Sequence, residues 1–189
     1  PVHLDGIRQV LQGERIELTR EDKFASYLRL DDRACLRQIF SDHGKDLSAD
    51  QEERLVTQKN QWVLGALRGH YGVLPEVRPL LEGLQSDYYF AVVSGALKSE
   101  VSEVLTQGGV ASYFRVVIGA NDVAKGKPDP EGYLTALKEL NRNHIPSSEI
   151  LLPEECVVVE DSPWGIRAGK AALMKCIGIT HSYGRDQLQ

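Results

Sequence analysis

The stretch Val157-Val158-Val159-Glu160-Asp161-Ser162 joins a strand pattern to two adjacent carboxylates. Three consecutive valines predict a buried strand, because β-branched residues favour strands and no polar residue alternates with them. Ser162 and the proline after it are typical of a helix start, with the serine as N-cap and the proline at the first helical position. The two acids therefore follow a strand of an α/β fold, at the carboxyl end where open α/β sheets bind ligands.

The same alternation of strand, loop and helix repeats through residues 73–189. Apolar, β-rich runs predict further strands at 88–93, 114–118 and 176–180. Between the second and third strands, Asp129 can cap a helix that has Pro130 at its first position. Such alternation indicates one parallel sheet covered on both faces, with right-handed crossovers.

Residues 1–72 have a different pattern, in which apolar side chains recur at helical spacing. Thr19 lies three residues before Asp22, and Ser48 lies three before Gln51, as in the capping boxes that start helices. We therefore expect a helical bundle at 1–72 and an α/β core at 73–189. The apolar positions that carry the helical spacing are Leu4, Ile7, Leu11, Phe24, Tyr27, Leu28, Leu36, Ile39, Phe40, Leu55, Trp62 and Leu67.

The composition excludes several classes of function. The chain has 189 residues, is 42% hydrophobic and carries a net charge of -5, so no basic surface suggests a nucleic-acid partner. No apolar run approaches the roughly 20 residues that cross a bilayer, and no leader is evident, so we expect a soluble, cytoplasmic protein without a membrane partner. Cys35, Cys156 and Cys176 are widely spaced in apolar sequence, which favours packed thiols over disulfides or a zinc site.

Two loops carry candidate phosphate-binding residues. Ser94 follows a predicted strand, and Gly95 would let the backbone approach a ligand, so that a hydroxyl and helix N-terminal amides could cradle a phosphate. The alternative is a serine that only caps the next helix. Lys127 lies between Gly126 and Pro128, where a stiffened loop would fix an ammonium near phosphoryl charge. The alternative is a solvated loop lysine.

Glu160 and Asp161 are the candidate metal ligands. Carboxylate oxygens are the hard ligands that Mg²⁺ prefers, and two acids beside a buried strand are costly unless positive charge lies nearby. The alternative is a solvated pair in a loop.

Together, these segments resemble three motifs of the haloacid dehalogenase superfamily, in the subgroup of small phosphatases and β-phosphoglucomutase-like enzymes. The three are Val92-Val93-Ser94-Gly95, Gly126-Lys127-Pro128-Asp129-Pro130 and Val157-Val158-Val159-Glu160-Asp161-Ser162, in the order of the family's second, third and fourth motifs. The helical region is similar to the subgroup's cap, which is inserted between the first and second core strands. The resemblance covers almost the whole chain and implies a Rossmann-like three-layer core with a helical-bundle cap.

The resemblance also implies a reaction. In the family an aspartate attacks phosphorus, and a second aspartate two residues later acts as general acid and base. By the same resemblance, Ser94 would hold a phosphate oxygen, Lys127 would stabilise the nucleophile and phosphoryl group, and Glu160 and Asp161 would bind Mg²⁺ directly or through water. The expected function is Mg²⁺-dependent hydrolysis of a small phosphorylated metabolite, such as a sugar phosphate or phosphoglycolate, by a monomer.

The family's first motif, which carries both catalytic aspartates, has no match here. His3-Leu4-Asp5-Gly6-Ile7 resembles it with histidine in place of the nucleophile, but only two residues precede His3, too few for the strand that would aim it. The alternative alignment, in which Pro1-Val2-His3 begins the first cap helix, fits better. Asp5 is therefore not expected to be catalytic.

The missing strand lies in the middle of the family's sheet, so its absence would leave unpaired edges on its neighbours. We therefore expect the sequence to be a fragment, marginal in stability and inactive alone, that lacks its first strand and part of its tail.

The cap would decide the substrate. His3 is the expected substrate-binding residue there, with Arg29, Asp32 and Arg33 as further candidates. Phosphatase is favoured over a β-phosphoglucomutase-like mutase as the commoner activity of the subgroup. A non-catalytic homologue that only binds metal and phosphate is the alternative from another class, and dehalogenation fits poorly because that branch uses no Mg²⁺.

Overall fold

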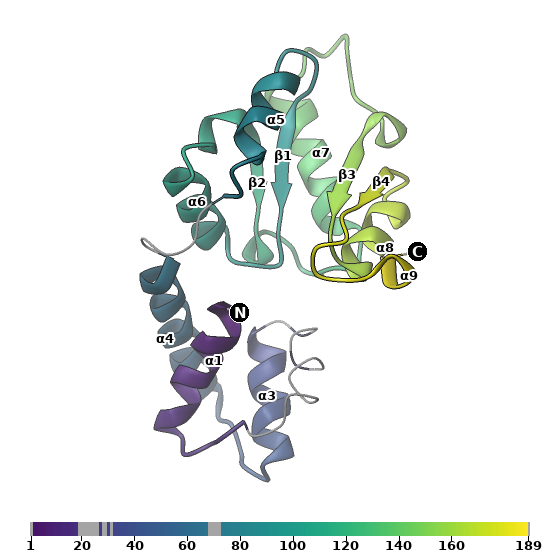
Figure 1. Ribbon diagram of the computed structural model, residues 1–189. Helices are drawn as coiled ribbons and strands as arrows, with labels where there is room; N and C mark the ends of the chain where they lie inside the picture. The colour runs from purple at the N-terminus through teal and green to yellow at the C-terminus, as the bar shows by residue number, and fades with distance from the viewer. Residues whose placement is uncertain (1, 19–26, 28–29, 31, 68–72, 189) are drawn as a thin grey trace. The chain divides into compact units, whose positions relative to one another are not determined.

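The computed structural model describes residues 2–18, 27, 30, 32–67 and 73–188. It divides the chain into two units, Pro1–Tyr71 and Gly72–Gln189, which are treated separately below (Figure 1). The helix expected around Phe24 and Leu28, with its start at Thr19 and Asp22, lies outside the described residues, apart from Tyr27.

The first unit is helical in its described part. Its helices are α1 (Val2–Gly13), α3 (Asp32–Asp42) and α4 (Ala49–Leu67). The amide of Gln51 donates to Oγ of Ser48 over 3.2 Å, which confirms the predicted start of α4. One core joins the three helices; its buried members are Ile7, Val10, Leu11, Ile16, Tyr27, Cys35, Leu36, Ile39, Phe40 and Leu55.

The second unit alternates strands and helices, as predicted. Its strands are β1 (Phe90–Val93), β2 (Phe114–Ile118), β3 (Val157–Glu160) and β4 (Lys175–Gly178). Its helices are α5 (Val77–Leu84), α6 (Lys98–Gln107), α7 (Glu131–Asn143), α8 (Pro163–Ala171) and α9 (Arg185–Leu188), with 3₁₀ turns at Ala111–Tyr113, Ala120–Asp122 and Pro153–Glu155. Helix α5 was not predicted from the sequence.

The described strands form two parallel pairs rather than the single sheet expected. β1 pairs with β2, from Phe90 opposite Phe114 to Val93 opposite Ile118. β3 pairs with β4, from Val157 opposite Lys175 to Glu160 opposite Gly178. β1 and β3 do not bond to each other, so within the described residues each has an unpaired edge.

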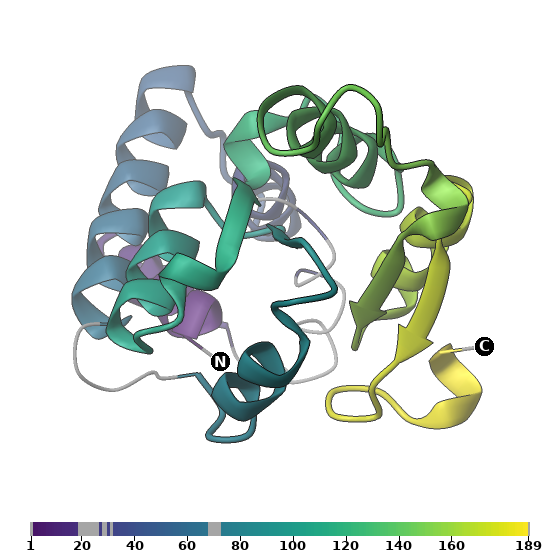
Figure 2. The ribbon, with the colours of Figure 1, turned by 90° about the horizontal axis from the view of Figure 1, so that it is seen from above.

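Helix α7 connects the two pairs (Figure 2). Its Ala136 and Leu140 pack with Val116 and Ile118 of β2, while Leu137 packs with Val158 of β3. On the opposite face of the first pair, α5 and α6 contribute their own cluster; its buried members are Leu81, Leu105 and Val110, with Phe90, Val92, Phe114 and Val117 packed against them. The first pair is therefore covered on both faces.

The second pair is covered on one face. Val158 and Cys176 pack toward α7 and α8, with Ala168 fully buried between them. On the other face Val159 is 58% exposed and its register partner Ile177 is 55% exposed. The described residues thus leave an apolar sheet face in contact with solvent.

The three cysteines are free thiols, as predicted. No helix in the described ranges combines the length and the apolarity that a membrane span requires.

Candidate active site

The candidate site lies at the carboxyl end of β3, where Glu160 is the last residue of the strand. Successive side chains of a strand alternate between its faces, so Glu160 projects to the same side as Val158, toward α7. The side chain of Glu160 is only 9% exposed. A carboxylate at this depth needs donors around it, and the structure supplies them from three segments.

The loop before α7 supplies a lysine. The Glu131 carboxylate accepts hydrogen bonds from the amides of Ala124 and Lys125 at 2.8 and 2.9 Å. Oδ1 of Asp129 accepts from the Glu131 amide at 3.0 Å. These bonds fix the backbone on both sides of Lys127. α7 has Pro130 as its N-cap residue, one position later than predicted, but the Asp129 side chain accepts from the first turn of the helix as predicted.

The ammonium of Lys127 lies between the ends of β1 and β3. Nζ donates to the carbonyl of Val93 over 3.0 Å and to Oε1 of Glu160. The lysine side chain is 20% exposed, so it is not the solvated loop residue that was the alternative. One cation therefore joins two strand ends that do not pair with each other.

Tyr133 completes the surroundings of this ion pair. Its hydroxyl donates to Oε1 of Glu160 over 3.1 Å, and its ring centroid is 5.1 Å from Nζ of Lys127. Burial, and then the charge and hydrogen bond of Glu160, raises the pKa of Tyr133 well above its usual value. The phenol therefore remains a donor at neutral pH.

The other oxygen of Glu160 is held by the start of α8. Oε2 accepts from the amides of Asp161 and Ser162, each at 3.1 Å, and from Oγ of Ser162 at 2.9 Å. The same Oγ accepts from the Gly165 amide at 3.0 Å, which confirms Ser162 as the N-cap. Burial alone would raise the pKa of Glu160, but Lys127 and Ser162 outweigh burial and hold that pKa below its usual value.

Asp161, the residue after Glu160, makes an exposed hydrogen bond. Its Oδ2 accepts a hydrogen bond from Oγ of Ser182, in the segment after β4. The neighbouring carboxylates thus differ in environment: Glu160 is enclosed by protein donors, whereas Asp161 lies at the exposed end of β3.

Ser94 and Gly95 lie at the end of β1, next to Val93. Oγ of Ser94 accepts from the amide of Ala96 over 3.1 Å, and the Ser94 amide donates to the carbonyl of Ile118 over 2.9 Å. A Cβ added at Gly95 would meet nothing within 4 Å. The loop is therefore anchored to β2 while the space at Gly95 stays open.

In the first unit, a buried lysine brings two of the predicted residues together. Nζ of Lys59, 1% exposed, lies 2.8 Å from Nδ1 of His3 and 2.8 Å from Oδ2 of Asp32. Arg33 instead forms an ion pair with Glu52, which links α3 to α4. Arg29 lies outside the described residues.

Asp5 lies within α1 and pairs with Arg8 over 3.2 Å. The segment that starts at Val2 is a helix and not a strand, as the cap-helix alignment expects, and its place in a cap stays a prediction.

The donor set at the end of β3 was compared with the needs of a divalent cation. Within the described residues, no group of three or more His, Cys, Asp or Glu side chains could hold a metal. Mg²⁺ is commonly held by one or two carboxylates together with waters and substrate phosphate. Asp161 fits that role directly, and Glu160 fits it through water because both of its oxygens already accept protein hydrogen bonds.

Sequence reasoning missed Tyr133, Ser182 and Lys59 as parts of these sites. Tyr133 stands at helical spacing with Leu137 and Leu140, which suggests a core residue, although a buried phenol needs a partner for its hydroxyl, and that is a usable signal. Lys59 and Ser182 gave no signal, since their partners lie far away in the sequence.

Comparisons with known proteins agree with this geometry. A family model described as "Hydrolase: haloacid dehalogenase-like hydrolase" matches residues 1–172. Among curated relatives, the chain is 37% identical over 97 residues to validoxylamine A 7'-phosphate phosphatase of Streptomyces hygroscopicus subsp. limoneus. The matched region covers 51% of this chain and 41% of that protein. It is 36% identical over 110 residues to a phosphorylated carbohydrates phosphatase of Thermotoga maritima, covering 57% and 47%. Each match spans less than half of the relative's length.

The fold is similar to solved structures over nearly the whole chain. A crystal structure of β-phosphoglucomutase from Clostridium difficile superimposes with a TM-score of 0.81 at 23% identity, covering 99% of this chain and 79% of that one. At this identity the match confirms the predicted fold and nothing finer.

Proposed function

Because the chain belongs to the haloacid dehalogenase-like hydrolases, we propose that it is a Mg²⁺-dependent phosphohydrolase of small phosphorylated metabolites. The observation that carries this proposal is the position of the Lys127 ammonium, between the Val93 carbonyl and Glu160 at two adjoining strand ends. The names of the relatives, which are phosphatases of a validoxylamine phosphate and of phosphorylated carbohydrates, support a sugar phosphate as the substrate class. A phosphoglycolate phosphatase of Salmonella typhimurium, 29% identical over 157 residues, supports a phosphoglycolate-like alternative.

In this proposal Lys127 and Ser94 act on the phosphoryl group. An ammonium has three protons, and the hydrogen bonds of Lys127 to Val93 and Glu160 use two of them. The third is available to a phosphoryl oxygen. Ser94 offers its hydroxyl, and the open space at Gly95 admits another phosphate oxygen to the loop backbone.

Asp161 would hold Mg²⁺ directly, and Glu160 would do so through water. When bound, the cation would neutralise charge on the phosphoryl oxygens. Glu160 has a second role that needs no metal: it keeps Lys127 and the first turn of α8 in fixed positions at the edge of the site. The nucleophilic aspartate of the proposed reaction belongs to the motif that the sequence analysis did not find within residues 1–189.

The cluster of His3, Lys59 and Asp32 is the proposed substrate-recognition site of the helical unit. Lys59 donates from a buried position to groups on α1 and α3, so a change at any member alters the others. Such a polar cluster suits sugar hydroxyls, which both donate and accept hydrogen bonds.

Release of inorganic phosphate from a panel of sugar phosphates and phosphoglycolate, with Mg²⁺ or with a chelator, tests this proposal. In the chain extended upstream through a first-motif strand, we expect Mg²⁺-dependent release from at least one substrate, and we expect Lys127→Ala to abolish it. Interconversion of sugar-phosphate isomers without phosphate release would instead show a mutase. Metal and phosphate binding without turnover, in a chain that includes the first motif, would show a non-catalytic homologue.

A further inference from the structure

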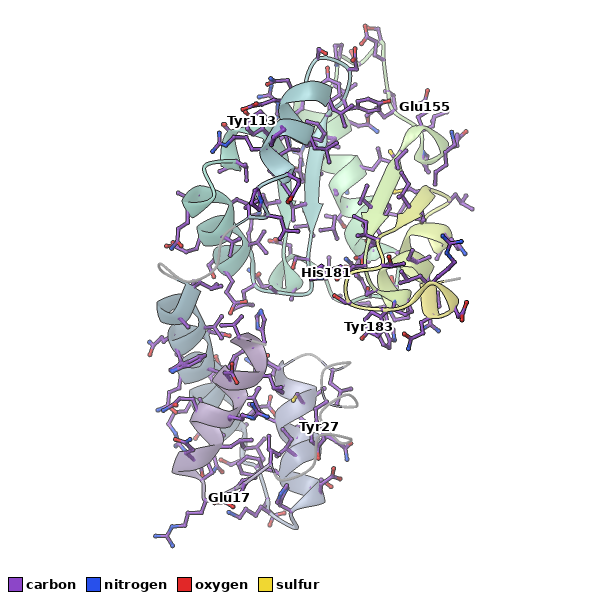
Figure 3. All side chains as sticks on the ribbon, viewed as in Figure 1. Glu17, Tyr27, Tyr113, Glu155, His181 and Tyr183 are labelled. Atoms are coloured by element: carbon purple, nitrogen blue, oxygen red, sulfur yellow. The ribbon has the colours of Figure 1, made fainter. Side chains whose placement is uncertain are left out.

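The segment after β4 returns to the candidate site. The Ile179 amide donates to the carbonyl of Glu160 over 2.8 Å, one residue beyond the paired strands. The His181 amide then donates to the carbonyl of Ile179 over 2.9 Å, so the chain turns at this point. Figure 3 shows the labelled His181 and Tyr183 at the end of the unit where β3 finishes.

The Ser182 hydroxyl reaches Asp161 from this turn. Its Oγ donates to Oδ2 of Asp161, across 21 positions in the sequence. A hydroxyl bonded to one carboxylate oxygen limits rotation of the carboxylate and leaves the other oxygen to face a ligand.

A ring contact holds the turn in place next to Ser182. The Tyr183 ring lies edge-on to Trp164 of α8, with centroids 5.6 Å apart and planes at 70°. The Arg167 guanidinium lies 5.9 Å from the Trp164 centroid, and its Nε donates to the carbonyl of Pro163 over 3.2 Å. The turn is therefore attached to α8 as well as to β3, and Ser182 does not depend on its own hydrogen bond for its position.

We propose that Ser182 is a positioning residue for Asp161, and that the contact between Tyr183 and Trp164 fixes Ser182 in that role. This inference rests on the proposed function, because it takes Asp161 as the direct Mg²⁺ ligand. Groups that hydrogen-bond to metal ligands commonly change metal affinity by about 10- to 100-fold when removed. The exposure of this hydrogen bond places Ser182 at the lower end of that range.

Calorimetric titration of the full chain with Mg²⁺ alone tests the inference without any need for turnover. We expect Ser182→Ala to weaken Mg²⁺ binding about tenfold. Ser182→Thr keeps the hydroxyl and should bind Mg²⁺ as the parent does. Ser147→Ala removes an exposed serine from the segment between α7 and β3 and should also leave binding unchanged.

Two further variants separate positioning from general stability. Tyr183→Phe keeps the ring and should leave Mg²⁺ affinity unchanged, whereas Tyr183→Leu should weaken it. The melting temperature without Mg²⁺ should be the same in Ser182→Ala as in the parent, since a merely structural role would lower it while sparing metal affinity.

Asp161→Asn distinguishes the failure of this inference from the failure of the proposed function. If Asp161→Asn loses Mg²⁺ binding while Ser182→Ala and Tyr183→Leu retain it, the positioning role is wrong and the metal role of Asp161 stands. If Asp161→Asn binds Mg²⁺ as the parent does, both are wrong.

Discussion

At the scale of single residues, Lys127 connects the parts of the site. It contacts a backbone carbonyl of β1, a carboxylate of β3 and the ring of a tyrosine from α7. Its charge lowers the pKa of Glu160 against the effect of burial. A residue with this many partners affects both the chemistry and the order of the site when it is changed.

Replacement of Lys127 by alanine should lower kcat about 100- to 1000-fold, the usual effect of removing one group that stabilises charge in the transition state. Lys125→Ala is the matched control, because that side chain lies in the same loop but is 74% exposed. Steady-state kinetics in Mg²⁺ would measure both variants. A change confined to KM in Lys127→Ala would contradict the proposed role.

Glu160 should stabilise the fold at neutral pH and lose this effect in acid. Its pKa is lower in the folded state than in the unfolded chain, so the unfolded state binds more protons as the pH falls through the usual glutamate range. The unfolding free energies of the parent and of Glu160→Gln can be measured with denaturant in the presence of a chelator. The difference between the two proteins should therefore be larger at pH 7 than at pH 4. An equal difference at both values would mean that Glu160 gains nothing from Lys127.

At the scale of elements, the sequence predicts the strands of the core and the start of α8 well. Three valines, two acids, a serine and a proline suffice for β3 and the cap of α8, because each is a local preference. The sequence does not predict that the Glu160 carboxylate bonds to that same serine, to Tyr133 and to Lys127. The contacts with Tyr133 and Lys127 join residues that are far apart in the sequence and depend on the packing of α7 and its preceding loop against β3, so no local pattern encodes them.

Gly165 lies in the first turn of α8 next to Glu160, so its substitution tests the position of the Glu160 carboxylate. A Cβ there would overlap the carboxylate of Glu160, so Gly165→Ala should displace Glu160 and lower both stability and activity. Gly83 of α5 is the matched control, since a Cβ there meets nothing within 4 Å. Gly83→Ala should stabilise the protein by about 0.5–1 kcal/mol through helix propensity.

Thermal unfolding and phosphatase assays on both alanine variants would check this contrast. Stabilisation of Gly165→Ala to the same extent as Gly83→Ala would show that the carboxylate does not occupy the position described.

At the scale of the whole molecule, the division into a helical unit and an α/β unit follows from the change of sequence pattern near residue 73. Pairing of the strands does not follow from it. Apolar runs show that four strands exist, but whether they join in one sheet depends on what lies between β1 and β3, and the described residues place no strand there. The expectation of unpaired edges came from the family resemblance rather than from any of the four runs.

The open apolar face of the second strand pair should cause the 189-residue chain to self-associate. Val159 and Ile177 lie side by side in register and are both more than half exposed; Val157 of β3 and Ile179, just after β4, are exposed as well. Contiguous apolar surface of this kind promotes association. We expect the 189-residue chain to bind a hydrophobic dye such as ANS and to self-associate in sedimentation experiments.

The double variant Val159→Thr, Ile177→Thr keeps β-branched side chains and should reduce both effects. Leu134→Gln is the control, because it removes an exposed apolar side chain of α7 outside this face. Dye binding that falls equally in the control would show that the face is not its cause.

Hydrolysis of an aryl phosphate tests whether the ends of β1 and β3 form a Mg²⁺-dependent phosphoryl-transfer site. The assay compares residues 1–189 with the same chain extended upstream through a first-motif strand, each with Mg²⁺ and with a chelator, and repeats the active form with Lys127→Ala. The account predicts Mg²⁺-dependent hydrolysis in the extended form only, and its loss in the variant. Hydrolysis by residues 1–189 alone, or full activity of Lys127→Ala, would contradict it.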